Sequence, residues 1–478
     1  MPLPKVVRWS SALLAMLVLA LVPAAQAQAH GVSATADLQL AQTFAGNELT
    51  VVIRRTPEVP GPLLVDVIAH APVRARSLEL GVRSVELGAL SAGEIALSDA
   101  GIQSAQLRVT AAGIHELTLR TGSEQALIPF RVLVPKPAGW EFFIYGAFGV
   151  AGLLILTGIA STTIGVLRPF AVPQALLVLV ALVAASTTAM LSKDLPPSTP
   201  EGAPEVGSAR GDPTDGSAPG GRPYANLTLR TEPAKPVTGK PVTITLLLTD
   251  GNTGRPVDDL VAHHAALLHT VITGEAGKDF HHVHPVRTGP GLYRLQLTMR
   301  SPGRHLLYAE FERADSGAQL VTGSFVVDRA PTGQPRRAAA ARRGTGPALS
   351  APEYGTGSIQ LSPGKPVAGR PVTIAAHVTA DGRPATDLQP WLGMAGHLIV
   401  RDPESAFFGH VHELTSMAAQ SRSPDQPPPD ETVAAEGPEL RFTFTFPAAG
   451  RYLVWIQYAR GFRIYTVPTT VTVSKGQP

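Results

Sequence analysis

Cysteine is absent from this 478-residue sequence, and its absence removes several kinds of site. Without thiols there can be no disulfides, thiolate-bound zinc, iron–sulfur clusters, blue-copper centres or cysteine nucleophiles. Charge is also scarce. Charged residues make up 16% of the chain and the formal net charge is +3, which is too small to indicate a nucleic-acid partner. Each domain must therefore depend on its hydrophobic core for stability.

Glycine and proline are abundant, with 46 and 44 residues, and hydrophobic residues make up 44% of the chain. This composition is typical of short strands joined by many turns, and of flexible linkers. The length leaves room for about three domains.

The first 29 residues have the pattern of a secretory signal. Lys5 and Arg8 supply a positive start, residues 12–22 an apolar run, and residues 27–29 a small-residue cleavage site. An uncleaved anchor helix is the alternative. In either case the sequence predicts export from the cytoplasm.

Two long apolar runs predict transmembrane helices. Residues 142–167 and 170–191 carry no charge, and each is long enough to cross a hydrocarbon core of about 30 Å. Only Arg168 and Pro169 separate them, so the runs are expected to form a hairpin. Its single positive charge favours the cytoplasmic side, which places the flanking domains outside. The alternative is a buried helical hairpin in a soluble protein.

The rest of the chain has the pattern of β-sandwiches. Residues 30–135 contain short runs of alternating polarity separated by glycine- and proline-containing turns, which predicts an antiparallel sandwich. Further on, the chain repeats itself: GKPVTI at residues 239–244 matches GRPVTI at residues 369–374, and the two copies continue in parallel. We therefore expect a mainly β protein with three immunoglobulin-like β-sandwich domains and a two-helix transmembrane hairpin.

The predicted domains are a signal peptide (1–29), an N-terminal β-sandwich (30–138), two transmembrane helices (139–192), a disordered linker (193–223), sandwich repeat 1 (224–329), a second linker (330–354) and sandwich repeat 2 (355–478).

Histidines recur at matched positions in the two repeats. Each repeat has one histidine, then a turn, then a Phe-x-His-x-His motif. His281 falls outside the match, because its counterpart is Gly409. The matched histidines are His269, His282 and His284 in repeat 1, and His397, His410 and His412 in repeat 2.

Strand geometry gives this spacing a meaning. Residues i and i+2 of a strand point to the same face, so His282 and His284 are expected to lie together. A hairpin centred on the intervening turn sets His269 opposite His284, and His397 opposite His412. Three imidazoles on one face can bind one ion, with Cu(II), Zn(II) and Ni(II) all suited to them. The alternative is that both repeats inherited packing histidines on a core face.

Three further residues are candidate ligands. His264 in repeat 1 and Met394 in repeat 2 lie near the matched histidines in sequence, and a thioether would favour Cu(I). Cleavage after Ala29 would give His30 a free amine beside its imidazole, and cleavage after Ala27 would put it third; both arrangements chelate copper. His30 as an ordinary residue after the signal is the alternative.

The two repeats resemble a known family. The residues that carry the resemblance are His269 with Phe280-x-His-x-His284 in repeat 1, and Gly393-Met-Ala-Gly-His397 with Phe408-x-His-x-His412 in repeat 2. They look like the YtkA-like and related envelope heavy-metal-binding domains. That resemblance implies an immunoglobulin-like sandwich and a role in copper or other heavy-metal handling. The N-terminal domain is distantly similar to CopC-type periplasmic copper carriers.

These patterns lead to one expected function and one alternative. We expect a membrane-anchored, extracytoplasmic metal-binding protein in copper or other heavy-metal homeostasis, with one site in each repeat. Copper is the first expected ion and zinc the second. The expected partners are the cytoplasmic membrane and a metal transporter or other envelope protein, but no nucleic acid. No catalytic motif is present, so we do not expect an enzyme. The alternative is a structural protein that presents immunoglobulin-like domains to envelope partners without metal.

Overall fold

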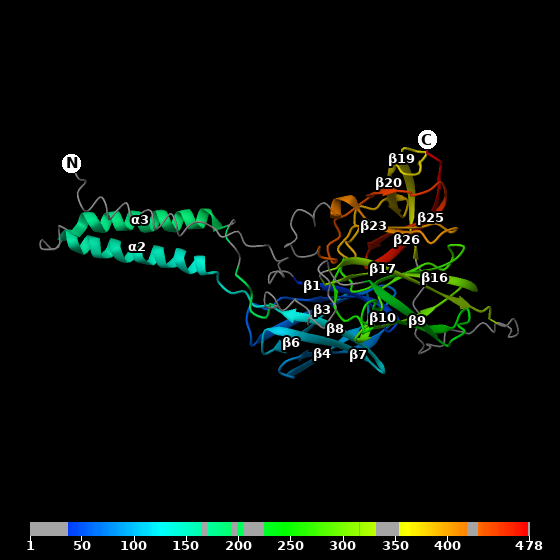
Figure 1. The fold of residues 1–478 in the computed structure, drawn as a ribbon, viewed down its shortest axis with the longest axis horizontal. Helices are drawn as coiled ribbons and strands as arrows, with labels where there is room; N and C mark the ends of the chain where they lie inside the picture. Colours follow the sequence, from blue (N-terminus) through cyan, green and yellow to red (C-terminus); the bar gives the residue numbers. More distant parts are fainter. Residues whose placement is uncertain are drawn as a thin grey trace. The chain divides into compact units, whose positions relative to one another are not determined.

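The computed structural model describes residues 37–163, 170–192, 195, 198–203, 224–314, 316–330, 353–417 and 429–476. It contains six β-sheets and two long helices, drawn in Figure 1. The sheets form three immunoglobulin-like β-sandwiches, so the expected fold class is confirmed. The chain divides into two compact units. One contains both helices and the other contains all three sandwiches.

The N-terminal sandwich consists of two four-stranded antiparallel sheets. The apolar members of each alternating run are buried between the sheets, as in β7, where every second residue is buried. The first sheet contains β1 (Leu38–Phe44), β2 (Asn47–Ile53), β3 (Gly61–His70) and β6 (Gly101–Val109). The second contains β5 (Leu90–Leu97), β4 (Arg76–Ser84), β7 (Gly113–Thr121) and β8 (Glu124–Val132).

Repeat 1 pairs a four-stranded sheet with a five-stranded sheet. The four-stranded sheet contains β14 (Val286–Gly289), β15 (Leu292–Thr298), β10 (Pro241–Asp250) and β9 (Ala225–Glu232). The five-stranded sheet contains β11 (Leu260–Val261), β16 (Gly303–Arg313), β12 (His269–Gly274), β13 (His281–Val283) and β17 (Gly317–Val327). The histidine-bearing strands β12 and β13 are neighbours in this second sheet, and β13 is its edge.

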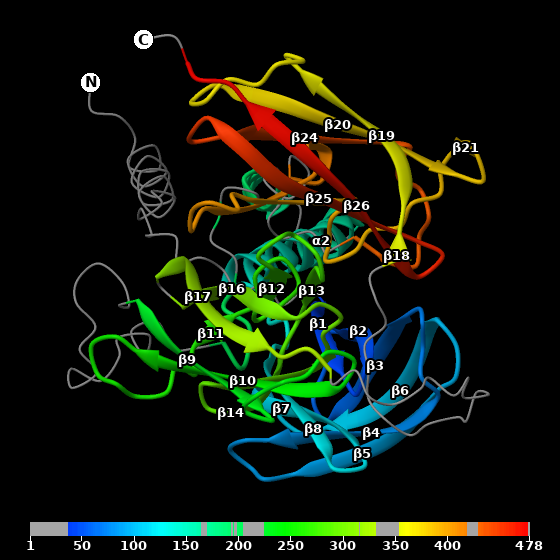
Figure 2. The same cartoon turned by 90° about the vertical axis from the view of Figure 1, so that its right-hand side faces the viewer.

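Repeat 2 also pairs a four-stranded sheet with a five-stranded sheet, and only its short edge strands pair differently, so the repeated sequence encodes a repeated fold (Figure 2). Its five-stranded sheet contains β18 (Glu353–Tyr354), β26 (Arg463–Val473), β25 (Gly450–Arg460), β22 (His397–Arg401) and β23 (Phe408–His412). Its other sheet contains β19 (Thr356–Ser362), β20 (Pro371–Ala380), β21 (Arg383–Pro384) and β24 (Glu439–Thr445). β18 begins repeat 2 within the segment predicted as linker.

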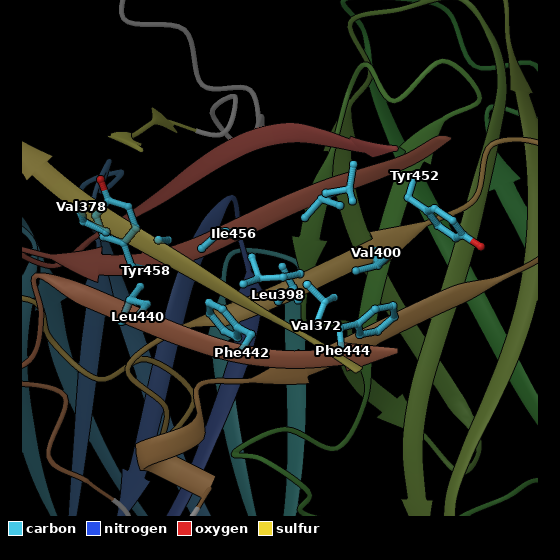
Figure 3. Close-up of a cluster of buried hydrophobic side chains, with 14 of the residues drawn as sticks. Val372, Val378, Leu398, Val400, Leu440, Phe442, Phe444, Tyr452, Ile456 and Tyr458 are labelled. Atoms are coloured by element: carbon cyan, nitrogen blue, oxygen red, sulfur yellow. The ribbon is translucent and has the colours of Figure 1, made fainter. Parts of the chain in front are cut away.

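The core of repeat 2 lies between these two sheets, as Figure 3 shows. Phe442 of β24 is fully buried there and packs among side chains from the facing sheet, including Leu398 and Ile456. Such a core is the main source of stability in a domain without disulfides. The histidine strands β22 and β23 belong to the opposite sheet from Phe442.

The two helices are α2 (Gly139–Thr163) and α3 (Ala171–Met190). Both are long and apolar enough to cross a membrane, over Gly139–Ala160 and Val172–Met190. They contact each other along their length. The predicted signal peptide, the turn at Arg168 and Pro169, and most of both predicted linkers lie outside the described residues.

Candidate metal centre

The predicted hairpins place three histidines together in each repeat. His397 pairs with His412 across β22 and β23, and the register of Thr270 with Val283 in repeat 1 sets His269 opposite His284. The expected pairing is therefore confirmed. In each set, one potential ligand atom from every residue lies within 4.8 Å of the others. We define triad 1 as His269, His282 and His284, and triad 2 as His397, His410 and His412.

Hydrogen bonds on the outer side of triad 1 fix which ring nitrogens carry protons. His269 Nε2 lies 2.9 Å from the carbonyl oxygen of His263, which can only accept, so Nε2 is the donor. His284 Nδ1 likewise donates to a Glu48 carboxylate at 2.5 Å, and His282 Nδ1 to Gln457 Oε1 at 2.8 Å. The other nitrogen of each neutral ring carries a lone pair, and these three nitrogens are buried without a hydrogen-bond partner.

Triad 2 repeats this arrangement in two of its three rings. His397 Nε2 donates to the carbonyl oxygen of Trp391 at 3.0 Å, and His410 Nδ1 to Glu310 at 2.7 Å. The first bond leaves a lone pair on His397 Nδ1, which lies 3.3 Å from His410 Nε2, within hydrogen-bond distance. His412 Nε2 is buried and has no hydrogen-bond partner.

Both triads can hold an ion after small side-chain rotations. Metal–nitrogen bonds of about 2.0–2.1 Å in a tetrahedral site require nitrogens about 3.4 Å apart. The hydrogen bonds on the other nitrogens are the orienting contacts that metal-bound histidines usually have. The arrangement therefore fits a transition-metal ion with three imidazole ligands and one open position.

The two triads are in contact, although the sequence predicted a separate site in each repeat. The rings of His282 and His410 are 5.1 Å apart between centroids, and the rings of His269 and His410 are 5.8 Å apart. Moreover, the supporting contacts are exchanged: Gln457 of repeat 2 holds triad 1, and Glu310 of repeat 1 holds triad 2. Glu310 and Gln457 occupy matching places, opposite His269 and His397 respectively.

Aromatic side chains of one repeat also stack on aromatic side chains of the other. Phe280 stacks on Trp455 at 4.7 Å, and Phe408 stacks on Tyr308 at 4.4 Å. Phe280, which could have marked a core face within its own repeat, therefore contacts the other repeat. The buried Arg401 of repeat 2 donates to the carbonyl oxygens of Gly274 and Glu275.

Four of the triad histidines, His269, His282, His397 and His412, are held neutral by their surroundings. Burial lowers the pKa of His269, His282 and His397 well below 6.5, and neighbouring histidines lower it further. The pKa of His412 is also lowered, first by burial and then by His410. Because a histidine must be neutral to bind a metal, this environment presents ligands without first removing protons.

The other predicted ligands have different outcomes. The ring of His264 lies 4.1 Å from that of His412, so this repeat 1 residue adjoins triad 2. Burial lowers the pKa of His264 to about 3. Met394 is fully buried, and its backbone bonds to Trp391. His30 lies outside the described residues.

His281, the unmatched histidine, is excluded from triad 1. Its Nε2 lies 3.2 Å from Asp279, and Nε2 of His305 lies 3.2 Å from the other oxygen of the same carboxylate. These contacts lower the pKa of Asp279, although its burial acts in the opposite direction. The absence of a counterpart in repeat 2 correctly separated His281 from the triad.

Sequence reasoning missed the residues that orient the rings. Glu48 lies in the N-terminal domain, far from His284 in sequence, and no local pattern connects them. Thr43 of the same domain also contacts His284, through its backbone. Glu310 and Gln457 could have been found by extending the repeat alignment through β16 and β25, where they occupy matching positions.

Comparisons with known proteins support the duplication. A sequence profile described as a domain of unknown function, DUF8832, matches residues 224–330 and again residues 353–475. The sequence matches none of the curated proteins. The resemblances to YtkA-like and CopC-type proteins remain predictions.

Solved structures similar to this chain include chicken CNTN1 FN1–FN3 domains, with 8% identity over 88% of this chain and 97% of that chain, and a TM-score of 0.17. Invasin, a bacterial integrin-binding protein, has 10% identity over 89% of this chain and 60% of that chain, with a TM-score of 0.15. A two-domain fibronectin type-III segment of chicken tenascin has 10% identity over 53% and 99%, with a TM-score of 0.15. The two regions that match DUF8832 coincide with the two repeats.

Proposed function

We propose that this chain is a membrane-anchored, extracytoplasmic protein that binds copper, or secondarily zinc, through triads 1 and 2. It would sequester or relay the ion in the service of metal homeostasis. The observation that carries the proposal is the set of unpaired imidazole lone pairs buried in triad 1. Leaving a polar atom buried and unpaired costs about 1–3 kcal/mol. A bound cation would satisfy all three at once.

The packing alternative explains less. A histidine that serves only as a core residue needs partners for both ring nitrogens, or an apolar neighbour in its place. In triad 1 each ring has one nitrogen bonded and the other buried without a hydrogen-bond partner. This one-sided pattern occurs three times in one triad, and it favours ligation.

Removing two ligands from triad 1 is expected to abolish one site. In the full chain, purified in detergent, His282→Ala with His284→Ala should lower bound copper by one ion per chain. Affinity at that site should fall at least about 100-fold, because one imidazole cannot hold the ion alone. The measurement is copper titration under a competing chelator, followed by metal analysis.

A matched control separates specific from surface binding. His377 is a histidine of β20 with a 37% exposed side chain that lies beside Glu439, outside both triads. His377→Ala should leave copper binding unchanged. If wild type and the triad 1 variant bind copper equally weakly, the function proposed here is wrong, and a metal-free scaffold for envelope partners becomes the better interpretation.

Membrane anchoring has its own test. Only 6% of the apolar stretch of α2 and 11% of that of α3 is buried, whereas the core helix of a soluble protein is mostly buried. The full chain should therefore stay with the membrane pellet after an alkaline carbonate wash. Leu156→Arg, at a position of α2 that is 68% exposed, should disfavour insertion by about 3 kcal/mol, whereas Leu156→Phe should not. Release of the wild-type chain by the wash would contradict anchoring by these helices.

A further inference from the structure

We propose that triads 1 and 2 form one dinuclear copper centre enclosed between the two repeats. This inference rests on the proposed metal-binding function and goes further, because the sequence alone predicts two independent sites. It also explains the contacts between the repeats. Each repeat would supply three ligands to one ion, and it supplies one side chain that orients a ligand of the other ion.

The ring spacings support a single centre. Within triad 1 the centroids are 5.1–5.8 Å apart, and within triad 2 they are 4.8–5.5 Å apart. Across the boundary, His282 lies 5.1 Å from His410 and 5.8 Å from His397. Rings from different triads are thus as close as rings within one. Ions held in both triads would be near neighbours, and their interaction would be strong because the surroundings are buried.

The charges around the two triads favour a particular pair of ions. All six imidazoles are neutral when they ligate, so they contribute no charge. Each triad has one ring held by a carboxylate: Glu48 holds His284, and Glu310 holds His410. Two copper(I) ions would balance these two negative charges, and three nitrogens satisfy copper(I) without a fourth ligand.

A pair of copper(II) ions would instead leave two positive charges uncompensated in a buried space. The open position on each ion then favours a small anion between them. Water can supply it by losing a proton to solvent, since a bound dication lowers the pKa of its water. A hydroxide formed in this way would be shared by the two copper(II) ions, and neither ion would change its oxidation state.

Exposure indicates the direction of access. His412 and His264 beside it are partly exposed, whereas the His410 side chain is only 4% exposed and all three residues of triad 1 are buried. An ion from outside would therefore meet triad 2 first. The deeper triad 1 would then fill from triad 2.

The test is a spin count on the full chain. Metal-free protein in detergent is given two equivalents of copper(II) sulfate, and bound copper is compared with the integrated electron paramagnetic resonance signal. We expect two bound ions, with less than about half of their spins detected, because a hydroxide bridge couples neighbouring copper(II) ions. His282→Ala with His284→Ala should bind one copper with its full spin.

Each result decides between the two proposals. Two bound ions with full spin intensity, or only one bound ion in the wild type, would overturn the dinuclear centre and leave metal binding intact. Absence of tight copper binding would overturn the proposed function itself. The wild-type spin count does not depend on any variant folding. A second, isosteric variant, Glu310→Gln, should weaken binding at triad 2 by about 10–100-fold and keep the coupling when copper is in excess.

Discussion

Acidifying the metal-free protein from pH 7 to pH 5.5 is expected to remove about 5 kcal/mol from its free energy of unfolding. Five histidines near the interface have a lowered pKa in the folded chain, caused first by burial. Unfolding returns the pKa of each histidine to an ordinary value of 6.5. The unfolded state therefore takes up more protons than the folded state, and the free energy of unfolding decreases as the pH is lowered. Each histidine contributes about 1 kcal/mol over this range. They are His264, His269, His282, His397 and His412.

Urea denaturation followed by circular dichroism, repeated at several pH values, would measure this loss. The window stays above the range in which ordinary carboxylates titrate, so the histidines dominate it. His269→Gln with His282→Gln should reduce the pH dependence by about 2 kcal/mol. Stability that is flat between pH 7 and 5.5 would show that these rings are not buried and neutral in the folded protein.

Phe442→Ala is expected to lower the free energy of unfolding of repeat 2 by about 3–5 kcal/mol. The ring is fully buried between the two sheets (Figure 3). Truncation removes its burial and leaves a cavity that the packed strands cannot fill. Tyr354→Ala is the matched control, because this aromatic is 65% exposed and its loss should change stability by about 0.5 kcal/mol or less.

Copper should restore part of what Phe442→Ala removes. A ligand that binds only the folded state at 100 times its dissociation constant adds about 2.7 kcal/mol per site. Triad 2 lies on β22 and β23, in the sheet that faces Phe442, so the substitution leaves every ligand in place. Recovery by copper in Phe442→Ala, but not in the same variant with His410→Ala and His412→Ala, would link binding to the folded state of repeat 2. Equal recovery in both would contradict that link.

The sequence predicted most of the fold because its signals are local or repeated. Alternating polarity indicated an antiparallel sandwich over residues 30–135, where the structure has β1 to β8. Hydrophobic length identified α2 and α3. The internal repeat matched β12 and β13 to β22 and β23. The position of the turn predicted the hairpin register, and a one-residue slip would have turned the matched histidines to opposite faces.

The rest of the site could not be predicted, because it depends on contacts between domains. Nothing near Glu48 in the sequence indicates that its carboxylate meets His284. Similarly, Phe280 and Phe408 had two acceptable explanations until their stacking partners in the other repeat were known. Such choices depend on how folded surfaces pack, and hydrophobic periodicity carries no information about them.

By itself, the sequence determined that each repeat brings three histidines to one face of a hairpin, because strand periodicity and turn position are properties of the local chain. Only the tertiary structure decided that the two faces meet, that their supporting side chains are exchanged, and that one carboxylate supports each triad. The physical reason is that burial and charge at the histidines come from residues distant in the chain, which only the packing of complete domains brings together.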